Sequence, residues 1–162
     1  MNGLDTSTLV KLVLVLILLG IGIFSVVSGI RNRKKGEASL SWPTVDGVIT
    51  NTWIEEKTDT DEDGISSTTY TPRWEYQYQV EGTTYTSSRI SYGAVKGYGR
   101  RSKAQEELGR FPIHSTVKVY FDPYNFTETV LVPGTKGTML GVIIGAILIV
   151  VSIGIAVAGL LK

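Results

Sequence analysis

The chain contains no cysteine and a single histidine among its 162 residues. The absence of cysteine excludes disulfides, thiol nucleophiles and cysteine-ligated zinc, so the redox state of the compartment leaves no mark on the sequence. The one histidine, His114, cannot form a metal-binding cluster by itself, and a Pro112–Ser115 segment is typical of a turn. The formal net charge is only +1, which excludes the large basic excess of nucleic-acid-binding proteins.

Charge is also missing from two long apolar runs. Leu12–Ile30 and Thr138–Leu161 hold 19 and 24 residues without a charged side chain. A bilayer core of ~30 Å needs ~20 helical residues to cross it, and each run is apolar on all sides. We therefore expect a two-helix transmembrane hairpin in a multi-pass protein of the cell membrane, in direct contact with the lipid bilayer.

Two other interpretations of these runs are open. The first run resembles a cleaved signal peptide in its position, but the basic segment Arg31–Lys35 that follows it is typical of a stop-transfer signal. The second run resembles a tail that is removed for a lipid anchor, but no small-residue site with a polar spacer precedes it. Two retained spans are thus the interpretation we carry forward.

The runs divide the chain into five parts. These are a short N-terminal tail (1–11), the first transmembrane helix (12–30), a basic linker (31–41), a β-rich domain (42–134) and the second transmembrane helix (138–161). Only Lys11 and Lys162 lie on the side of the termini. Five basic residues flank the spans on the domain side: Arg31, Arg33, Lys34, Lys35 and Lys136. Because basic flanks stay in the cytoplasm, we expect a cytoplasmic domain with both termini outside.

Small residues recur in both apolar runs at helical spacing. Gly137, Gly141 and Gly145 are four residues apart in the second run. Small residues at this spacing allow two helix backbones to approach closely. They predict either packing of the two spans within one chain or a dimerisation face in a homo-oligomer.

The region between the runs has the alternating pattern of β-strands. A strand is expected over Val45–Glu56, and a polar loop is expected over Lys57–Thr69. The clearest period-two pattern places four apolar side chains on one face of the next strand: Trp74, Tyr76, Tyr78 and Val80. A Glu-Gly turn and a strand over Thr83–Ile90 complete a hairpin. Together with Trp42 and Tyr85, the four side chains form the predicted core.

The remainder of the domain is predicted to be shorter elements. Ser102 and Gln105 form a capping box that begins a helix over Lys103–Leu108, and strands are expected over Val117–Phe121 and Thr129–Val132. The predicted fold is a small mainly-β (α+β) domain with about five antiparallel strands and one short helix, arranged as an open barrel or a sandwich.

One acidic loop has part of a calcium-binding pattern. Asp59, Asp61 and Asp63 alternate before Gly64, as in the first half of a calcium loop whose carboxylates converge on the ion. The position that requires a bidentate glutamate holds Tyr70, and strands rather than helices are expected on both sides. We therefore expect an acidic, solvated loop without a cofactor, with Ca²⁺ at these aspartates as the alternative.

The ordered set of motifs resembles a widespread family of small membrane proteins whose shared region is catalogued as a domain of unknown function. The set runs from Trp42-Pro43-Thr44 through Tyr76-x-Tyr78-x-Val80-x-Gly82 to Val119-Tyr120-Phe121-Asp122-Pro123. The resemblance implies a β-rich domain that follows a membrane helix and often precedes a second one. It implies no activity, substrate or catalytic residue.

The motifs that mark common enzyme classes are absent from this sequence. It has no phosphate-binding glycine loop and no dinucleotide fingerprint, and neither apolar run carries an ionisable residue for a proton path. We expect a non-enzymatic, membrane-anchored binding, scaffold or accessory module that contacts a protein partner through hairpin edges or its aromatic face. A membrane-bound enzyme with a polar pocket and a small oligomeric channel or transport accessory are the alternatives.

Overall fold

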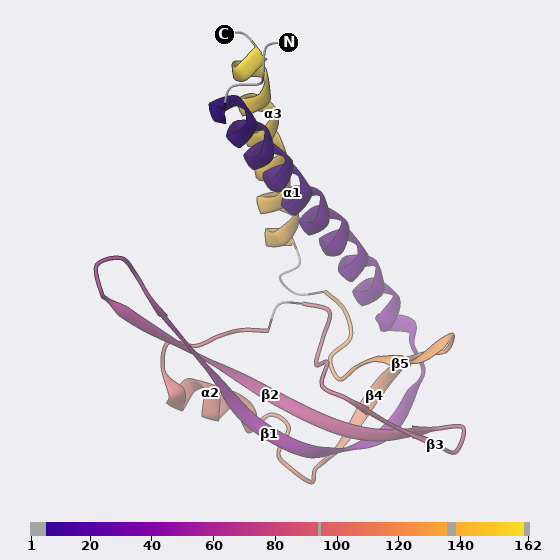
Figure 1. Ribbon diagram of the computed structural model, residues 1–162. Coiled ribbons are helices and arrows are strands. Elements are labelled where there is room, and N and C mark those ends of the chain that lie inside the picture. The colour runs from indigo at the N-terminus through magenta and orange to yellow at the C-terminus, as the bar shows by residue number, and fades with distance from the viewer. Residues whose placement is uncertain (1–5, 94, 136–138, 161–162) are drawn as a thin grey trace. The chain divides into compact units, whose positions relative to one another are not determined.

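The computed structural model describes residues 6–93, 95–135 and 139–160. The chain divides into a helical unit, formed by Met1–Lys34 and Gly137–Lys162, and a β-rich unit, Lys35–Lys136. Both units are drawn in Figure 1. Each unit has its own packing, and we describe them in turn.

The helical unit consists of α1 (Thr6–Ala38), which continues into the β-rich unit, and α3 (Met139–Leu160). Both helices are long and apolar enough to cross a membrane. Their apolar side chains are largely exposed, with Phe24 73 % and Val150 69 % accessible. Because a water-soluble surface rarely carries so continuous an apolar area, this exposure favours lipid around both helices.

The two helices pack against each other through small residues. A Cβ atom added to Gly22 would lie 2.9 Å from the carbonyl oxygen of Gly145, so the backbones meet where neither residue has a side chain. Nearby, the Ser25 hydroxyl donates to the carbonyl oxygen of Gly141 at 2.8 Å. The small-residue face of α3 thus lies against α1 of the same chain. Gly137, the first residue of the predicted series, lies outside the described residues.

α1 extends beyond the apolar run and includes most of the predicted linker. The helix continues to Ala38, and a 3₁₀ turn over Ser39–Ser41 follows it. Lysine, arginine, glutamate and alanine, which make up much of this segment, are good helix formers, and the first proline comes only at Pro43. The predicted linker over 31–41 is thus helical up to Ala38.

In the β-rich unit, five strands form one antiparallel sheet in the order β3-β2-β1-β4-β5. The strands are β1 (Thr44–Thr60), β2 (Ser66–Val80), β3 (Thr83–Ser87), β4 (Thr116–Asp122) and β5 (Asn125–Val130), and the one helix is α2 (Arg101–Leu108). The number of strands and the short helix agree with the prediction. The sheet is open, and all described strands belong to it, so the predicted sandwich of two sheets is wrong.

The sheet is curved enough for side chains of its two edges to meet. Tyr85 of β3 and Phe126 of β5 pack edge-to-face with ring centroids 6.3 Å apart. The Tyr78 hydroxyl donates to the carbonyl oxygen of Phe126 at 2.7 Å. These contacts cover the concave face although β3 and β5 are not hydrogen-bonded as neighbouring strands.

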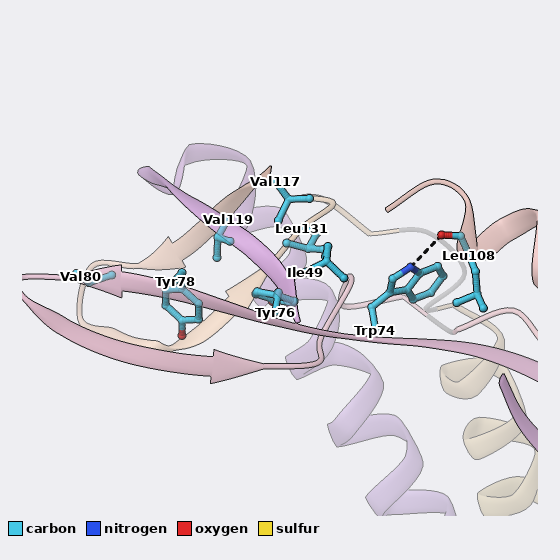
Figure 2. Packing of buried hydrophobic residues seen from close by; sticks show 9 residues of the cluster. All are labelled: Ile49, Trp74, Tyr76, Tyr78, Val80, Leu108, Val117, Val119 and Leu131. Atoms are coloured by element: carbon cyan, nitrogen blue, oxygen red, sulfur yellow. Dashed lines mark hydrogen bonds between the residues drawn. The ribbon is translucent and has the colours of Figure 1, made fainter. Parts of the chain in front are cut away.

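The core lies on this face, as Figure 2 shows. Trp74, Tyr76, Tyr78 and Val80 of β2 are buried, and the residues between them on the strand are more exposed. They pack with five further buried side chains: Ile49, Leu108, Val117, Val119 and Leu131. Tyr85 is half-buried at the edge of the cluster. Trp42, also half-buried, packs instead against Tyr92 with ring centroids 5.9 Å apart.

The predicted polar loop over Lys57–Thr69 is mostly strand. β1 and β2 remain paired as far as Thr60 and Ser66, which leaves only a short turn between them. Threonine and serine hydroxyls pair across this ribbon, at 3.0 Å between Thr58 and Thr68. β-branched threonine favours extended backbone, and this preference outweighed the polarity on which the loop prediction depended.

Smaller differences concern the ends of the other elements. α2 begins at Arg101, and its N-cap residue Arg100 makes no side-chain capping hydrogen bond, so the predicted capping box at Ser102 is wrong. β3 ends at Ser87 and β5 begins at Asn125. The β2–β3 turn places Glu81 and Gly82 at φ 50° and 78°, the left-handed conformation that two-residue hairpin turns require.

Candidate functional site

The β-rich unit carries a surface pocket of about 420 Å³. β2 contributes Pro72 and Trp74, the segment after α2 contributes Arg110 and Phe111, and the chain around Tyr98 lines it as well. Ligand pockets typically have volumes of about 300–1,000 Å³ and mostly apolar walls. The volume of this pocket therefore lies within the range of small-ligand sites.

Aromatic side chains form its walls. Trp74 and Phe111 pack edge-to-face, with ring centroids 6.0 Å apart and an interplanar angle of 84°. The indole Nε1 of Trp74 donates to the carbonyl oxygen of Leu108 at 3.4 Å (Figure 2). Tyr98 is held by a β-bridge to Tyr70, with reciprocal backbone hydrogen bonds of 2.8 and 2.9 Å. The Trp74 ring is thus fixed by contacts of its own side chain, and Tyr98 is fixed by its backbone.

Charged groups surround the aromatic walls. Arg110 and Glu107 form an ion pair at 2.5 Å. The Lys96 ammonium lies over the Tyr98 ring, 5.0 Å from its centroid. Burial, and then the negative charge of Glu107, raise the pKa of the Tyr98 hydroxyl. The phenol therefore stays protonated near neutral pH, with its hydroxyl hydrogen-bonded to Glu107.

A second polar cluster surrounds Glu128 of β5. Its carboxylate accepts hydrogen bonds from the Lys35 ammonium at 2.6 Å and from the Tyr92 hydroxyl at 2.6 Å, and it also pairs with Arg89. Arg89 in turn donates to the Tyr92 hydroxyl at 3.2 Å and lies over the Tyr92 ring. This Glu128 cluster joins the last turns of α1, the segment after β3 and the last strand of the sheet.

The surroundings of Glu128 favour its charged form. Burial by itself raises the pKa of a carboxyl group, but here the hydrogen bonds from Lys35 and Tyr92 and the charge of Arg89 outweigh it and lower the pKa of Glu128 to about 2. Burial and the neighbouring carboxylate raise the pKa of Tyr92. The cluster thus holds a carboxylate, two cations and a neutral phenol, which is a stable structural arrangement.

The Glu128 cluster lies where the chain enters and leaves the β-rich unit. The backbone N–H of Gly134 donates both to the carbonyl oxygen of Gly36 at 3.1 Å and to the Ser39 hydroxyl oxygen at 3.0 Å. The Ser39 hydroxyl also donates to the Gly36 carbonyl oxygen at 2.6 Å. These bonds fix the two ends of the β-rich unit side by side.

The three aspartates of the partial calcium pattern do not converge. Asp59 pairs with Lys57 at 3.1 Å, and an Asp61 carboxylate oxygen accepts the backbone N–H of Ile65 at 2.8 Å. Within residues 6–93, 95–135 and 139–160, no three side chains of the usual ligand types are grouped for a metal ion. The hydrogen bonds of Asp61 stabilise the turn, and Gly64 adopts a positive φ of 78° there.

His114 occupies a strained turn. Its φ of 66° lies in the left-handed region that favours glycine. The backbone N–H of His114 donates to the carbonyl oxygen of Ile49 at 2.8 Å, and the side chain is exposed. The residue therefore acts through its backbone, as predicted for a turn residue.

The β1–β2 ribbon offers a further candidate surface. β4 pairs with β1 only as far as Val48, and a register shift between Ile49 and Asn51 turns β1 away from the sheet. Beyond this bulge, the ribbon projects past the other strands (Figure 1). In the described part of the chain, β1 from Asn51 to Thr60 has β2 as its only strand partner, so its outer backbone edge is open.

Sequence reasoning did not identify the pocket or the Glu128 cluster. Lys35 and Glu128 are 93 positions apart in the sequence, and Arg89 and Glu128 are 39 apart. No local spacing signals contacts of this range. The one available hint was the concentration of aromatic and basic residues between 89 and 111, which includes Tyr92, Tyr98 and Phe111.

The described structure defines a class of protein in which an open β-sheet domain is inserted between two long apolar helices. Residues 45–136 match the family described as Domain of unknown function (DUF3592). The match covers more than half of the chain, which therefore belongs to this family. A domain of unknown function is thus found in the region whose motifs resemble one. No curated protein matches the chain.

Proposed function

We propose that this protein is a two-pass, membrane-anchored binding module that captures an extended segment of a partner protein. The observation that carries the proposal is the open edge of β1 between Asn51 and Thr60. Open strand edges present unpaired N–H and C=O groups, and a partner chain binds them by adding a strand. The proposal requires neither catalysis nor a bound metal.

The membrane part of the proposal is supported by the two apolar helices and by the ends of the β-rich unit. Because Gly36 and Gly134 are hydrogen-bonded, the chain enters and leaves the domain at one point. Two membrane spans that start from one point require the domain to lie on one face of the bilayer. Basic residues flank the spans mainly on the domain side, which favours the cytoplasmic face.

The ribbon has the properties of a surface that becomes ordered with a partner. From Glu55 to Thr60 every residue of β1 is exposed, so neither face of the ribbon is buried there. Two-stranded ribbons without a third strand are only marginally stable in water. An added strand along β1 would make new backbone hydrogen bonds without displacing any part of the described fold.

The charge of the ribbon indicates the chemistry of the partner. Residues 51–75 include seven acidic and two basic residues. Glu55 and Glu56 are paired with Arg73 and Arg101 at 2.6 and 2.5 Å, but the acidic residues of the turn are exposed to solvent. A basic extended segment is therefore the complementary partner.

The enzyme alternative receives less support from the structure. General acid–base catalysis by carboxyl groups requires at least one that is free to exchange protons in a concave site. The pocket near Trp74 contains one carboxylate, that of Glu107, which is already paired with Arg110. The small-residue faces of the helices, on which an oligomeric channel would depend, lie against each other within one chain.

Site-specific photo-crosslinking in native membranes tests the proposal. A photoreactive amino acid at Thr58, on the open edge, is expected to give one discrete adduct whose crosslinked peptide is basic and extended. The same group at Tyr124, which is 97 % exposed in the β4–β5 turn, serves as the matched control and is expected to give no such adduct.

A proline substitution makes this test specific for strand addition. Proline has no backbone N–H and blocks ladder hydrogen bonds. Thr60→Pro, with the crosslinker still at Thr58, is expected to remove most of the adduct while the chain remains folded. Equal adducts from Thr58 and Tyr124, or an adduct insensitive to the proline, would contradict the proposal.

A further inference from the structure

We infer that the pocket beside Trp74 binds a planar apolar ring that carries an anionic group, such as an aromatic carboxylate. This site is separate from the open edge of β1 and does not depend on strand addition. The inference combines three features of the pocket: its aromatic lining, the ion pair between two of its lining residues, and one lysine that has no carboxylate partner.

The walls select a flat ring. Trp74 has its only polar atom engaged with the Leu108 carbonyl oxygen, so its indole has no polar group left to be satisfied by a ligand. Phe111 packs against it in a T-shaped arrangement, and the backbone of Tyr98 is fixed by its bridge to Tyr70. Trp74 is only 3 % exposed, so a ligand ring would meet no more than the rim of its indole, and the half-buried Phe111 and Tyr98 offer more of their rings for edge-to-face contacts.

The charged side chains of the lining favour a ligand with a negative charge. Glu107 and Arg110 neutralise each other across 2.5 Å. In the described part of the chain, Lys96 makes a cation–π contact with Tyr98 but no ion pair with a carboxylate. A pocket with one uncompensated ammonium at its rim attracts an anion and disfavours a cation.

The experiment uses the full chain in zwitterionic lipid nanodiscs, labelled with 5-fluorotryptophan. The chain has three tryptophans, so ¹⁹F NMR gives three signals, which are assigned with Trp42→Phe and Trp53→Phe. The probes are 2-naphthoate and, as its cationic counterpart, 2-naphthylmethylamine. We expect 2-naphthoate to shift the Trp74 signal saturably and the amine to bind at least ~10-fold more weakly.

Two lysine variants connect the anion to Lys96. Lys96→Gln is expected to weaken 2-naphthoate binding about fivefold and to remove most of the preference over the amine. Lys118→Gln, which alters an exposed lysine of β4 paired with Asp46, is the matched control and should leave both affinities unchanged. Both substitutions are at exposed positions, so the folded domain is retained.

Three outcomes would overturn the inference. They are no saturable Trp74 shift at about 10 mM 2-naphthoate, equal binding of the amine, and an unchanged affinity in Lys96→Gln. A shift of only the Trp42 or Trp53 signals would also contradict the inference, because those residues do not line the pocket. None of these outcomes affects the crosslinking test at Thr58, so the two proposals fail independently.

Discussion

The backbone N–H of Gly134 donates to the carbonyl oxygen of Gly36 at 3.1 Å, which places the point where the chain leaves the β-rich unit next to the point where it enters. A Cβ atom on Gly36 would lie 2.8 Å from the Gly134 carbonyl oxygen and would collide with the Thr135 side chain. The close approach of the two segments therefore requires glycine at position 36.

Gly36→Ala is expected to destabilise the β-rich unit by about 2 kcal/mol, because the overlap is with backbone and cannot be relieved by rotating a side chain. Alanine at a helical position normally stabilises by up to ~1 kcal/mol, so the expected loss has the opposite sign to the propensity effect. Thermal unfolding followed by near-UV circular dichroism measures the change. Gly99→Ala is the control, because an added Cβ there meets nothing within 4 Å. A Gly36→Ala variant as stable as the parent would show that the contact between Gly36 and Gly134 is not tight.

Glu128 makes the stability of the β-rich unit depend on pH. Its pKa of about 2 in the folded protein lies below the ordinary value of 4.5, so the carboxylate contributes stability above pH 4.5 and loses it as pH falls toward 2. This lowering of the pKa corresponds to about 3 kcal/mol. Glu128→Gln is expected to lower stability by about 2 kcal/mol at pH 7 and to flatten the profile between pH 5 and pH 2.

The measurement is the difference in unfolding free energy between parent and variant at several pH values. Glu62→Gln, in the exposed β1–β2 turn, is the matched substitution and should leave the profile unchanged. If the Glu128→Gln variant lost as much stability on acidification as the parent, the hydrogen bonds from Lys35 and Tyr92 would have no energetic role.

His114 is a position where a substitution by glycine should stabilise. A φ of 66° costs a residue with a side chain about 1 kcal/mol relative to glycine. Part of this gain is offset by the larger entropy of glycine in the unfolded chain, so His114→Gly is expected to gain about 0.5 kcal/mol. Ile113→Gly, at the preceding exposed position, should destabilise. A loss of stability in His114→Gly would indicate that the imidazole has a role of its own.

The packing of α1 on α3 within one chain can be tested with a disulfide, since the chain has no cysteine of its own. A Cβ atom built on Gly29 lies 3.7 Å from the Cβ atom of Val142, within the range that disulfides require. Gly29→Cys with Val142→Cys is expected to oxidise within the monomer, as shown by protection from a maleimide reagent. Gly20→Cys with Val142→Cys should not, because a Cβ on Gly20 has no neighbour within 4 Å. Oxidation to covalent dimers would place this face between chains.

The local sequence pattern was sufficient to predict structure where that structure depends on a single helix or strand. The alternation of Trp74, Tyr76, Tyr78 and Val80 predicted the buried face of β2, because side chains of a strand point to opposite faces in turn. The two apolar runs likewise predicted the long helices, since few structures other than helices satisfy the backbone of such a segment.

Local pattern failed where distant segments determine the structure. The projecting β1–β2 ribbon depends on the bulge after Ile49, which no sequence pattern marked. The pocket depends on the segment around Tyr98 meeting β2, and the Glu128 cluster depends on contacts across 93 positions. Such contacts follow from the packing of the whole sheet, so a motif read along the chain does not contain them.

The central claim is that α1 crosses the membrane, so that the N-terminal end of the chain and the β-rich unit lie on opposite faces. Single cysteines at Ser7 and Ile65 test it directly in sealed, right-side-out membrane vesicles with a membrane-impermeant maleimide. We expect Ser7→Cys to react at once and Ile65→Cys, in the turn of the β1–β2 ribbon, to react only after the vesicles are permeabilised. Equal reactivity of the two cysteines in sealed vesicles would contradict a chain whose N-terminal end and domain lie on opposite sides of a bilayer.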